Sequence, residues 1–249
     1  KILVPAGELL IIDAFSGRVE REIGGGDFRT PVAASQGKIY ASSLGGTLYT
    51  FDLRGNVLWR FCTDGAYCTA PTLAYDLVYF ASFDRNIYCL DDKGTLYWKT
   101  KIPDLIDDAL CIWDSMVFAL SKDSFFYCLN PLTGEILWKK KFSDEQFMPP
   151  VFNGDSMLVL SDQGKLYALS PQRAAVKWFK ELNIVPTTPP IASPKALYFG
   201  SEDGLIAVDL NSGEFKTYLQ GCRINFIAQV RFEICAATQK GLILFQMEN

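Results

Sequence analysis

A short hydrophobic phrase recurs along this chain, and a polar residue and a turn follow each copy. Each copy has four apolar or small residues, then in most cases Asp, Asn or Ser, then a turn that usually contains Gly. The copies end at Asp13, Asp52, Asp91, Asn130, Ser170, Asp209 and Gln246. The steps between these positions are 39, 39, 39, 40, 39 and 37 residues. A fixed period of this length indicates a solenoid or a β-propeller.

Within one copy, short apolar stretches alternate with turn residues. The stretches expected as strands in the second copy are Thr30–Ala33, Lys38–Ala41, Thr47–Phe51 and Val57–Phe61. Gly45-Gly46 and Arg54-Gly55 separate the last three stretches, and such turns between apolar runs are typical of β-hairpins. No window has the apolar spacing of a helix. The sequence therefore predicts an all-β chain.

Repeated four-stranded antiparallel units are the blades of a β-propeller. Seven copies predict seven blades in a single domain that spans residues 1–249. The first copy has its second, third and fourth strands but no clear first strand, and the last copy has no fourth. We expect sequence before Lys1 to belong to the domain and to supply the missing outer strand. The alternative is a blade that keeps three strands.

Tryptophans recur seven or eight residues after the polar residue that ends the phrase. These tryptophans are Trp59, Trp98, Trp138 and Trp178. We expect them on the outermost strands, where each can pack on a neighbouring blade and donate its indole N–H to a carbonyl. Arg21 and Thr217 stand at this position in the first and sixth copies, so we expect looser packing there. The recurring aspartates are expected to accept hydrogen bonds within their turns.

Composition narrows the classes of function. Of the 249 residues 49% are hydrophobic, which is ample for a large core. The net charge is −4, so the basic surface of a nucleic-acid binder is not expected. No apolar run approaches the roughly 20 residues that span a bilayer. The chain has no histidine, which excludes Ser-His-Asp and Cys-His centres and histidine-ligated metals.

Seven cysteines without C-x-x-C spacing favour reduced thiols. Cys89 and Cys128 take the place that Ala168 and Ala207 hold in other copies, so we interpret them as small buried residues. Cys62 and Cys68 flank one loop and are the local pair to test for a disulfide. The free thiols slightly favour the cytoplasm, and a periplasmic or otherwise exported location is the alternative.

The repeat also resembles a known family. Cys128-x-Asn130-x-x-Thr133-Gly134-x-x-x-Trp138 is similar to the A-x-D-x-x-T-G-x-x-x-W repeat of the pyrroloquinoline-quinone (PQQ) β-propeller family, and the resemblance covers essentially the whole chain. That family includes quinoprotein dehydrogenases, an outer-membrane assembly lipoprotein, lumenal stress sensors and repeat domains that bind no quinone. Its dehydrogenases hold the cofactor between a tryptophan and a disulfide of two adjacent cysteines, a pair that this chain lacks. The resemblance therefore implies the scaffold but no cofactor and no catalytic residues.

Topology predicts where a function would reside. In a four-stranded meander, the connectors between blades and the turns between the second and third strands emerge on one face. Loops on a rigid scaffold commonly carry function, and aromatic and arginine side chains are enriched in binding hot spots. Near this face three carboxylates, Asp104, Asp107 and Asp108, precede Trp113 and could also bind a cation or a basic peptide. The alternative is a solvated acidic loop with Trp113 in the core. The candidate residues are Phe28, Arg29, Tyr67, Arg85, Asp107, Asp108, Trp113, Lys122, Phe147 and Arg223.

Three hypotheses for the function follow from these observations. The first is a non-catalytic, monomeric scaffold or sensing module that binds protein partners through one face. The second is a redox enzyme that binds a quinone or a metal in a central channel. The third is the ligand-binding domain of a larger exported sensor. We favour the first because no catalytic set of residues is visible.

Overall fold

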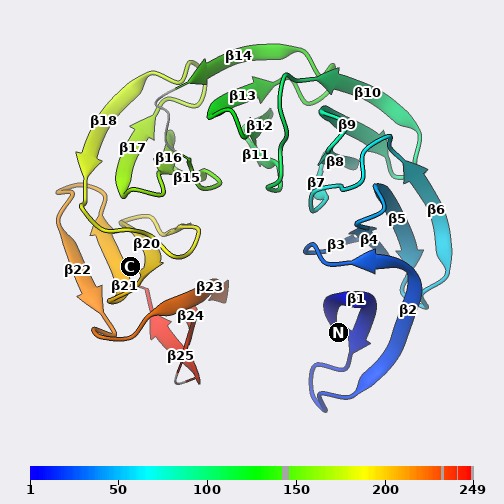
Figure 1. Ribbon diagram of the computed structural model, residues 1–249, viewed down its shortest axis with the longest axis horizontal. Coiled ribbons are helices and arrows are strands. Elements are labelled where there is room, and N and C mark those ends of the chain that lie inside the picture. The colour runs from blue at the N-terminus through cyan, green and yellow to red at the C-terminus, as the bar shows by residue number, and fades with distance from the viewer. Residues whose placement is uncertain (142–145, 231–232, 240, 248–249) are drawn as a thin grey trace. The chain divides into compact units, whose positions relative to one another are not determined.

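The computed structural model describes residues 1–141, 146–230, 233–239 and 241–247, and these residues form strands and no helix. The prediction of an all-β chain is therefore confirmed. The described strands form seven antiparallel sheets, as the seven copies predict (Figure 1). They belong to two compact units, Lys1–Phe142 and Ser143–Asn249, which we call unit 1 and unit 2.

Unit 1 contains four sheets. The strands of the first sheet are β1 (Ile2–Ile12) and β2 (Val19–Phe28). Those of the second are β3 (Ala33–Ser35), β4 (Lys38–Ser42), β5 (Thr47–Asp52) and β6 (Val57–Cys62). Those of the third are β7 (Thr72–Ala74), β8 (Leu77–Ser82), β9 (Asn86–Asp91) and β10 (Leu96–Lys101). Those of the fourth are β11 (Cys111–Trp113), β12 (Met116–Leu120), β13 (Phe125–Leu129) and β14 (Ile136–Lys141).

Unit 2 contains three sheets. The strands of its first sheet are β15 (Val151–Asn153), β16 (Ser156–Leu160), β17 (Lys165–Leu169) and β18 (Val176–Glu181). Those of the second are β19 (Ile191–Ala192), β20 (Ala196–Ser201), β21 (Gly204–Asp209) and β22 (Phe215–Tyr218). Those of the third are β23 (Ile224–Val230), β24 (Glu233–Thr238) and β25 (Gly241–Gln246). The last sheet thus has three strands among the described residues, which agrees with the missing fourth strand of the last copy.

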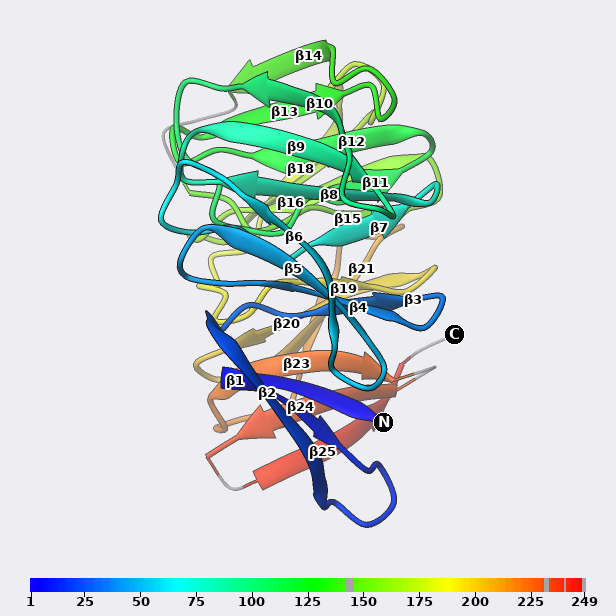
Figure 2. The same cartoon turned by 90° about the vertical axis from the view of Figure 1, so that its right-hand side faces the viewer.

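The first sheet differs from the prediction, because it has two strands instead of three. β1 is one continuous strand of 11 residues that pairs with β2 in a long ribbon (Figure 2). Gly7, with a φ of 92°, lies at a shift in the strand register rather than in a turn. A single glycine of this kind produces a bulge, which bends a strand without ending it.

The two middle strands of each four-stranded sheet form the core. Every residue of β8 and of β20 is buried, whereas the fourth strands β6, β14 and β18 alternate exposed and partly buried residues. A strand that is buried on both faces has the continuous apolar sequence seen here. The small position on the third strand is also buried, since Cys89 and Cys128 are both 0% exposed. Their interpretation as buried small residues is confirmed.

Tryptophans connect neighbouring sheets in unit 1, as predicted. The indole Nε1 of Trp59 donates to the carbonyl of Asp92 in the next sheet at 3.0 Å. The indole of Trp98 donates in the same way to the carbonyl of Pro131 at 2.8 Å. Each hydrogen bond satisfies a polar group that would otherwise be costly to bury.

A turn glycine of the next sheet lies directly against each of these indoles. A Cβ on Gly134 would come within 2.5 Å of the Trp98 ring, and one on Gly94 within 2.8 Å of Trp59. Both glycines have a positive φ, 71° and 85° respectively. In the first sheet, where Arg21 stands at the tryptophan position, Ile23 lies against the corresponding Gly55: a Cβ on this glycine would come within 2.9 Å of Ile23 and 3.9 Å of Arg21.

The Asp or Asn residue that ends five of the phrases caps the following turn. The Oδ1 atom of Asp52 accepts hydrogen bonds from the backbone N–H groups of Arg54 and Asn56, both at 2.8 Å. Asp209 accepts equivalent bonds from Asn211 and Ser212 at 2.9 and 2.7 Å. The predicted structural role of these carboxylates is confirmed.

One buried hydroxyl interrupts the apolar core of the second sheet. Thr50 is 0% exposed, and its Oγ1 is a buried atom without a hydrogen-bond partner among the described residues. Other sheets hold cysteine or alanine at this position, as Cys89 and Ala168 show. An unsatisfied buried hydroxyl destabilises the folded state.

Thr50→Val should therefore raise the free energy of unfolding by about 1–3 kcal/mol, because it removes the hydroxyl and keeps the branched shape. Urea denaturation measures the change. Thr217→Val is the matched control: Thr217 is exposed on β22, and its substitution should change the stability by less than about 0.5 kcal/mol. Equal effects of the two substitutions would contradict this account.

Candidate interaction surface

The connectors between sheets and the turns after the second strands meet at one end of the strands, as the topology predicts. Isolated bridges join the two kinds of segment in four sheets, as Phe28–Ser43, Cys68–Ser82, Phe147–Ser161 and Pro186–Ser201. The serine at the turn is buried in each case and in the remaining four-stranded sheet, where it is Ser121. Its hydroxyl bonds to the backbone of its own turn or of the connector, for example Ser121 to the carbonyl of Leu105 at 3.3 Å.

Two of the candidate surface residues are buried by these bridges. Phe28 is 0% exposed and packs edge-on against Tyr49 and Phe51, and Phe147 is 7% exposed and packs against Tyr167. Their expected place on the surface is therefore wrong. Backbone pairing to the turn serine carries the side chain at this connector position into the core.

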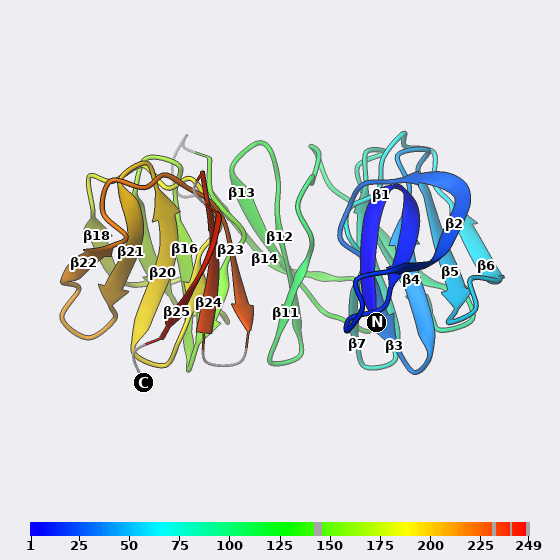
Figure 3. The same cartoon turned by 90° about the horizontal axis from the view of Figure 1, so that it is seen from below.

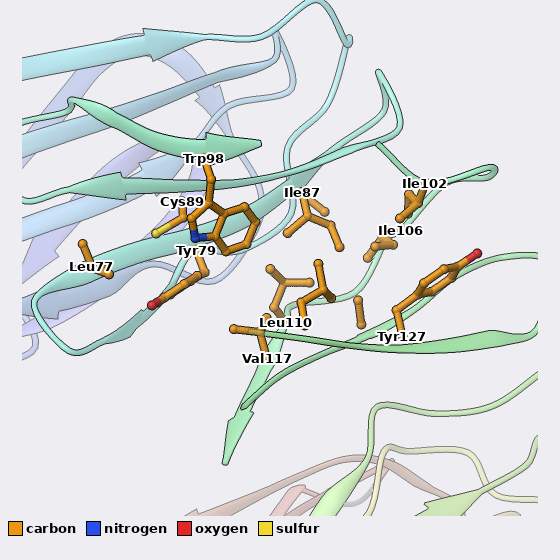
Figure 4. Close-up of a cluster of buried hydrophobic side chains, with 13 residues drawn as sticks. Leu77, Tyr79, Ile87, Cys89, Trp98, Ile102, Ile106, Leu110, Val117 and Tyr127 are labelled. Carbon is orange, nitrogen blue, oxygen red and sulfur yellow. The ribbon is translucent and has the colours of Figure 1, made fainter. Parts of the chain in front are cut away.

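The connector from β10 to β11 shows how buried residues support exposed ones. Ile102, Ile106 and Leu110 are each at most 2% exposed and join a cluster that includes Trp98 and Val117 (Figure 4). They recur every fourth residue, although the connector is not helical. The intervening segment is thereby held against the core, and Asp107 and Asp108 lie on its partly exposed side.

Five residues of unit 1 gather on this supported connector and the loops beside it. We call them the Tyr67 surface, and they are Tyr67, Phe83, Asp107, Asp108 and Lys122. The rings of Tyr67 and Phe83 lie 4.7 Å apart, and Phe83 is 37% exposed. Lys122 Nζ forms an ion pair with Asp107 Oδ2 at 2.5 Å, and the backbone N–H of Lys122 donates to the Leu105 carbonyl at 2.8 Å.

The pKa values of Tyr67 and Asp108 depend on charged neighbours within the Tyr67 surface. Burial raises the pKa of the Tyr67 hydroxyl, and the negative charges of Asp107 and Asp108 raise it further. Burial, followed by the charge of Asp107, raises the pKa of Asp108, while Lys122 opposes this shift. Asp107 and Asp108 therefore act on the same aromatic side chain.

The other candidate residues are placed differently. The Arg85 guanidinium donates to the Pro103 carbonyl at 3.4 Å, which puts Arg85 beside the connector of the Tyr67 surface. Arg29 pairs with Asp27 at 2.8 Å near the end of β2, and Arg223 pairs with Glu202 at 3.3 Å in unit 2.

Trp113 is not part of the Tyr67 surface, although it follows Asp108 closely in the sequence. It is the last residue of β11, at the hairpin to β12, whereas the connector enters β11 at its other end (Figure 3). It is partly buried and pairs with Met116 across the hairpin. The expectation that Trp113 belongs to the same face as Asp107 and Asp108 is therefore wrong.

The thiols and tryptophans do not fit the quinone site of the dehydrogenases that the sequence resembles. All seven cysteines are free, including Cys62 and Cys68, and none is adjacent to another in the sequence. Burial raises the pKa of Cys89 and of Cys128 to about 12. Trp59 and Trp98 are engaged between sheets. We therefore derive no step through a quinone.

Neither a metal-binding cluster nor a membrane-spanning helix is found among the described residues. Among the residues that the structure describes, no group of three or more Cys, Asp or Glu side chains is arranged to hold a metal ion. In the same residues no helix is long and apolar enough to cross a membrane. What the Tyr67 surface offers is an exposed aromatic ring next to fixed charges of both signs.

Comparison with known structures identifies the class of protein as a β-propeller. The crystal structure of BamB from Moraxella catarrhalis is similar with a TM-score of 0.81 and 17% sequence identity, over 98% of this chain and 80% of that chain. The computationally designed Ika8 protein is similar with a TM-score of 0.78 and 13% identity, over 98% of this chain and 79% of that chain. The seven sheets are thus the blades predicted from the repeat.

The family follows from the sequence itself. Residues 6–216 match the PQQ_2 family model, described as outer membrane protein assembly factor BamB, and the chain belongs to this family. No curated protein matches the sequence. The resemblance to the PQQ-type repeat is therefore confirmed.

The raised pKa of Asp108 predicts a dependence of stability on pH. The folded state holds the Asp108 proton more tightly than the unfolded state, so ionisation of Asp108 destabilises the fold as the pH rises above the ordinary value of about 4. Asp108→Asn should therefore raise the free energy of unfolding near neutral pH. The gain should disappear near pH 3, where wild-type Asp108 is also neutral. A gain that is equal at both pH values would show that charge is not the cause.

Proposed function

We propose that this chain is a non-catalytic β-propeller, a single domain over residues 1–249, that binds a protein partner through the Tyr67 surface. The family gives general support, because its description names an assembly factor and a propeller is a rigid scaffold for protein contacts. The particular surface rests on the arrangement of residues in unit 1.

One observation carries the proposal: an exposed ring, Phe83, and a partly buried one, Tyr67, lie beside an ion pair on a connector whose apolar residues are fixed in the core. Phe83 and Tyr67 supply apolar contact area at a small cost in conformational entropy, since each has only two side-chain torsions. Aromatic residues of this kind are enriched in binding hot spots. Ile102, Ile106 and Leu110 hold the connector in place, so little ordering is required on binding.

The charges favour a partner segment that carries a basic residue next to an apolar one. Asp107 already pairs with Lys122, whereas the raised pKa of Asp108 reflects a carboxylate that burial and Asp107 leave poorly stabilised. A cation from the partner beside Asp108 would relieve that repulsion. Arg85 and Lys122 at the margin would keep the orientation of the partner fixed through complementary charge.

The rival functions make different predictions. A quinone- or metal-dependent redox enzyme would bind PQQ together with Ca²⁺ and show the bound chromophore in its absorption spectrum. A ligand-binding sensor domain would bind a small molecule and would not need the Tyr67 surface for a protein contact. Stoichiometric binding of PQQ would overturn our proposal directly.

The proposal is tested by the double substitution Tyr67→Ala and Phe83→Ala. Loss of two hot-spot rings should weaken binding of the partner by about 2 kcal/mol or more, which is about 30-fold. Chemical cross-linking in cells that express the chain, followed by mass spectrometry, identifies partners. Titration calorimetry with the purified partner then measures the affinity.

Tyr97→Ala is the matched control, because Tyr97 is 60% exposed on the fourth strand β10, outside the Tyr67 surface. The control should bind its partner like the wild type. Cross-links that avoid the Tyr67 surface, or equal affinities of the wild type and the double variant, would overturn the proposed surface. Circular dichroism establishes that both variants remain folded.

A further inference from the structure

A small pocket lies at the end of the strands away from the Tyr67 surface, between the second and third sheets of unit 1. Its volume is about 170 Å³. Its polar lining comes from the hairpin after β3, the hairpin after β7, the turn after β9 and the middle of β4. The residues concerned are Gln36, Tyr40, Tyr75, Asp76 and Asp92.

The hydroxyl of Tyr40 has no hydrogen-bond partner in the part of the chain that the structure describes. The residue is 4% exposed, and its ring packs edge-on against Trp59 with the centroids 6.0 Å apart. Among the described residues no hydrogen bond engages its hydroxyl, yet Tyr40 lines the pocket. The hydroxyl itself opens on the pocket and is not sealed in the core, so what leaves it without a protein partner requires an explanation.

The neighbouring sheet provides the explanation, because it carries a tyrosine at the same position. Tyr79 stands in β8 where Tyr40 stands in β4, and its hydroxyl donates to the carbonyl of Pro131 at 3.2 Å. The indole of Trp98 donates to the same carbonyl. At that interface the tyrosine is therefore fully engaged within the protein.

At the interface between the second and third sheets, a lysine and not the tyrosine donates to the equivalent carbonyl. The carbonyl equivalent to that of Pro131 belongs to Asp92, and it accepts hydrogen bonds from the Trp59 indole at 3.0 Å and from Lys38 Nζ at 2.9 Å. Leu77 stands where Lys38 stands, so the third sheet has no such competitor. Lys38 thus replaces the tyrosine on the carbonyl, and the Tyr40 hydroxyl is left at the pocket.

The charge of the pocket indicates its ligand. Gln36 Nε2 donates to Asp76 Oδ1 at 3.0 Å, and Lys38 Nζ pairs with Asp92 Oδ2 at 2.7 Å. No described residue bonds to the second oxygen of either carboxylate. Two carboxylates and one ammonium give a local charge of −1, and each carboxylate has one oxygen that can still accept a hydrogen bond. A small cation with N–H donors matches both the charge and the hydrogen-bonding pattern.

We propose that this pocket of unit 1 binds a small organic cation with N–H groups, namely the guanidinium or ammonium end of a basic side chain. The cation would donate to the free oxygens of Asp76 and Asp92 and to the Tyr40 hydroxyl oxygen. Burial raises the pKa of Tyr40, so its hydroxyl stays protonated at neutral pH. The site is separate from the Tyr67 surface and does not depend on the proposed function.

The test uses the full chain and methylguanidinium chloride as the probe. The indole N–H resonance of Trp59 reports binding in ¹⁵N-correlated NMR spectra, since its ring contacts Tyr40. We expect a saturable shift at constant ionic strength. Tyr40→Phe and Asp76→Asn should each weaken binding about tenfold, because each removes a hydrogen bond to a charged group.

A matched control and a second variant separate loss of binding from loss of folding. Tyr79→Phe is the matched control, because its hydroxyl is engaged on Pro131, and this variant should bind like the wild type. Asp76 has a φ of 58°, a conformation that asparagine tolerates well, so Asp76→Asn should fold even if Tyr40→Phe does not.

Several outcomes would overturn the proposal. A shift that does not saturate, or affinities that Tyr40→Phe and Asp76→Asn leave unchanged, would remove the site. Equal binding of tetramethylammonium, which has no N–H donor, would show that only charge is sensed. Tight binding of Ca²⁺ at the same residues would identify a metal site instead. Selective binding of methylguanidinium or n-butylammonium supports the proposal.

Discussion

The contact between a tryptophan of one sheet and a turn of the next is the interaction on which the structure of unit 1 depends. Trp98 donates to the carbonyl of Pro131, and Gly134 lies so close to the indole that it has no room for a side chain. Thr100 completes the contact by donating to the Gly134 carbonyl at 2.6 Å. This explains why the repeat combines a capped turn, a glycine and a tryptophan at fixed spacing.

The same architecture decides where other chemistry can occur. Because sheets are joined through their outer strands and turns, the connectors at the opposite end need only a few apolar residues to stay in place. The connector from β10 to β11 uses Ile106 and Leu110 for this purpose and leaves Asp107 and Asp108 beside Tyr67. At the Tyr40 pocket the contact between sheets differs in one hydrogen bond. Lys38 donates to the carbonyl of Asp92, whereas at the next interface Tyr79 donates to the equivalent carbonyl of Pro131.

Sequence reasoning predicted the fold well because each copy repeats the same strands and turns. It failed at Phe28 and Phe147, since a connector aromatic looks exposed until its pairing with a buried turn serine is known. A signal was present, because Ser43, Ser82 and Ser121 also recur every 39 residues.

The free hydroxyl of Tyr40 could not be predicted, since it depends on which of two donors reaches one carbonyl. The grouping of Tyr67 with Asp108 likewise depends on contacts between different loops.

The central claim is that the indole and the turn glycine stabilise the sheet contact as one unit. A double-mutant cycle of Trp98→Leu and Gly134→Ala tests it by urea denaturation, with Gly37→Ala as the reference for backbone strain, because Gly37 has a φ of 77° and no neighbour within 4 Å. In the wild type, Gly134→Ala should cost roughly 1–3 kcal/mol more than Gly37→Ala, owing to the clash with the indole. In the Trp98→Leu background that excess should largely disappear. An excess that is the same in both backgrounds would contradict the account.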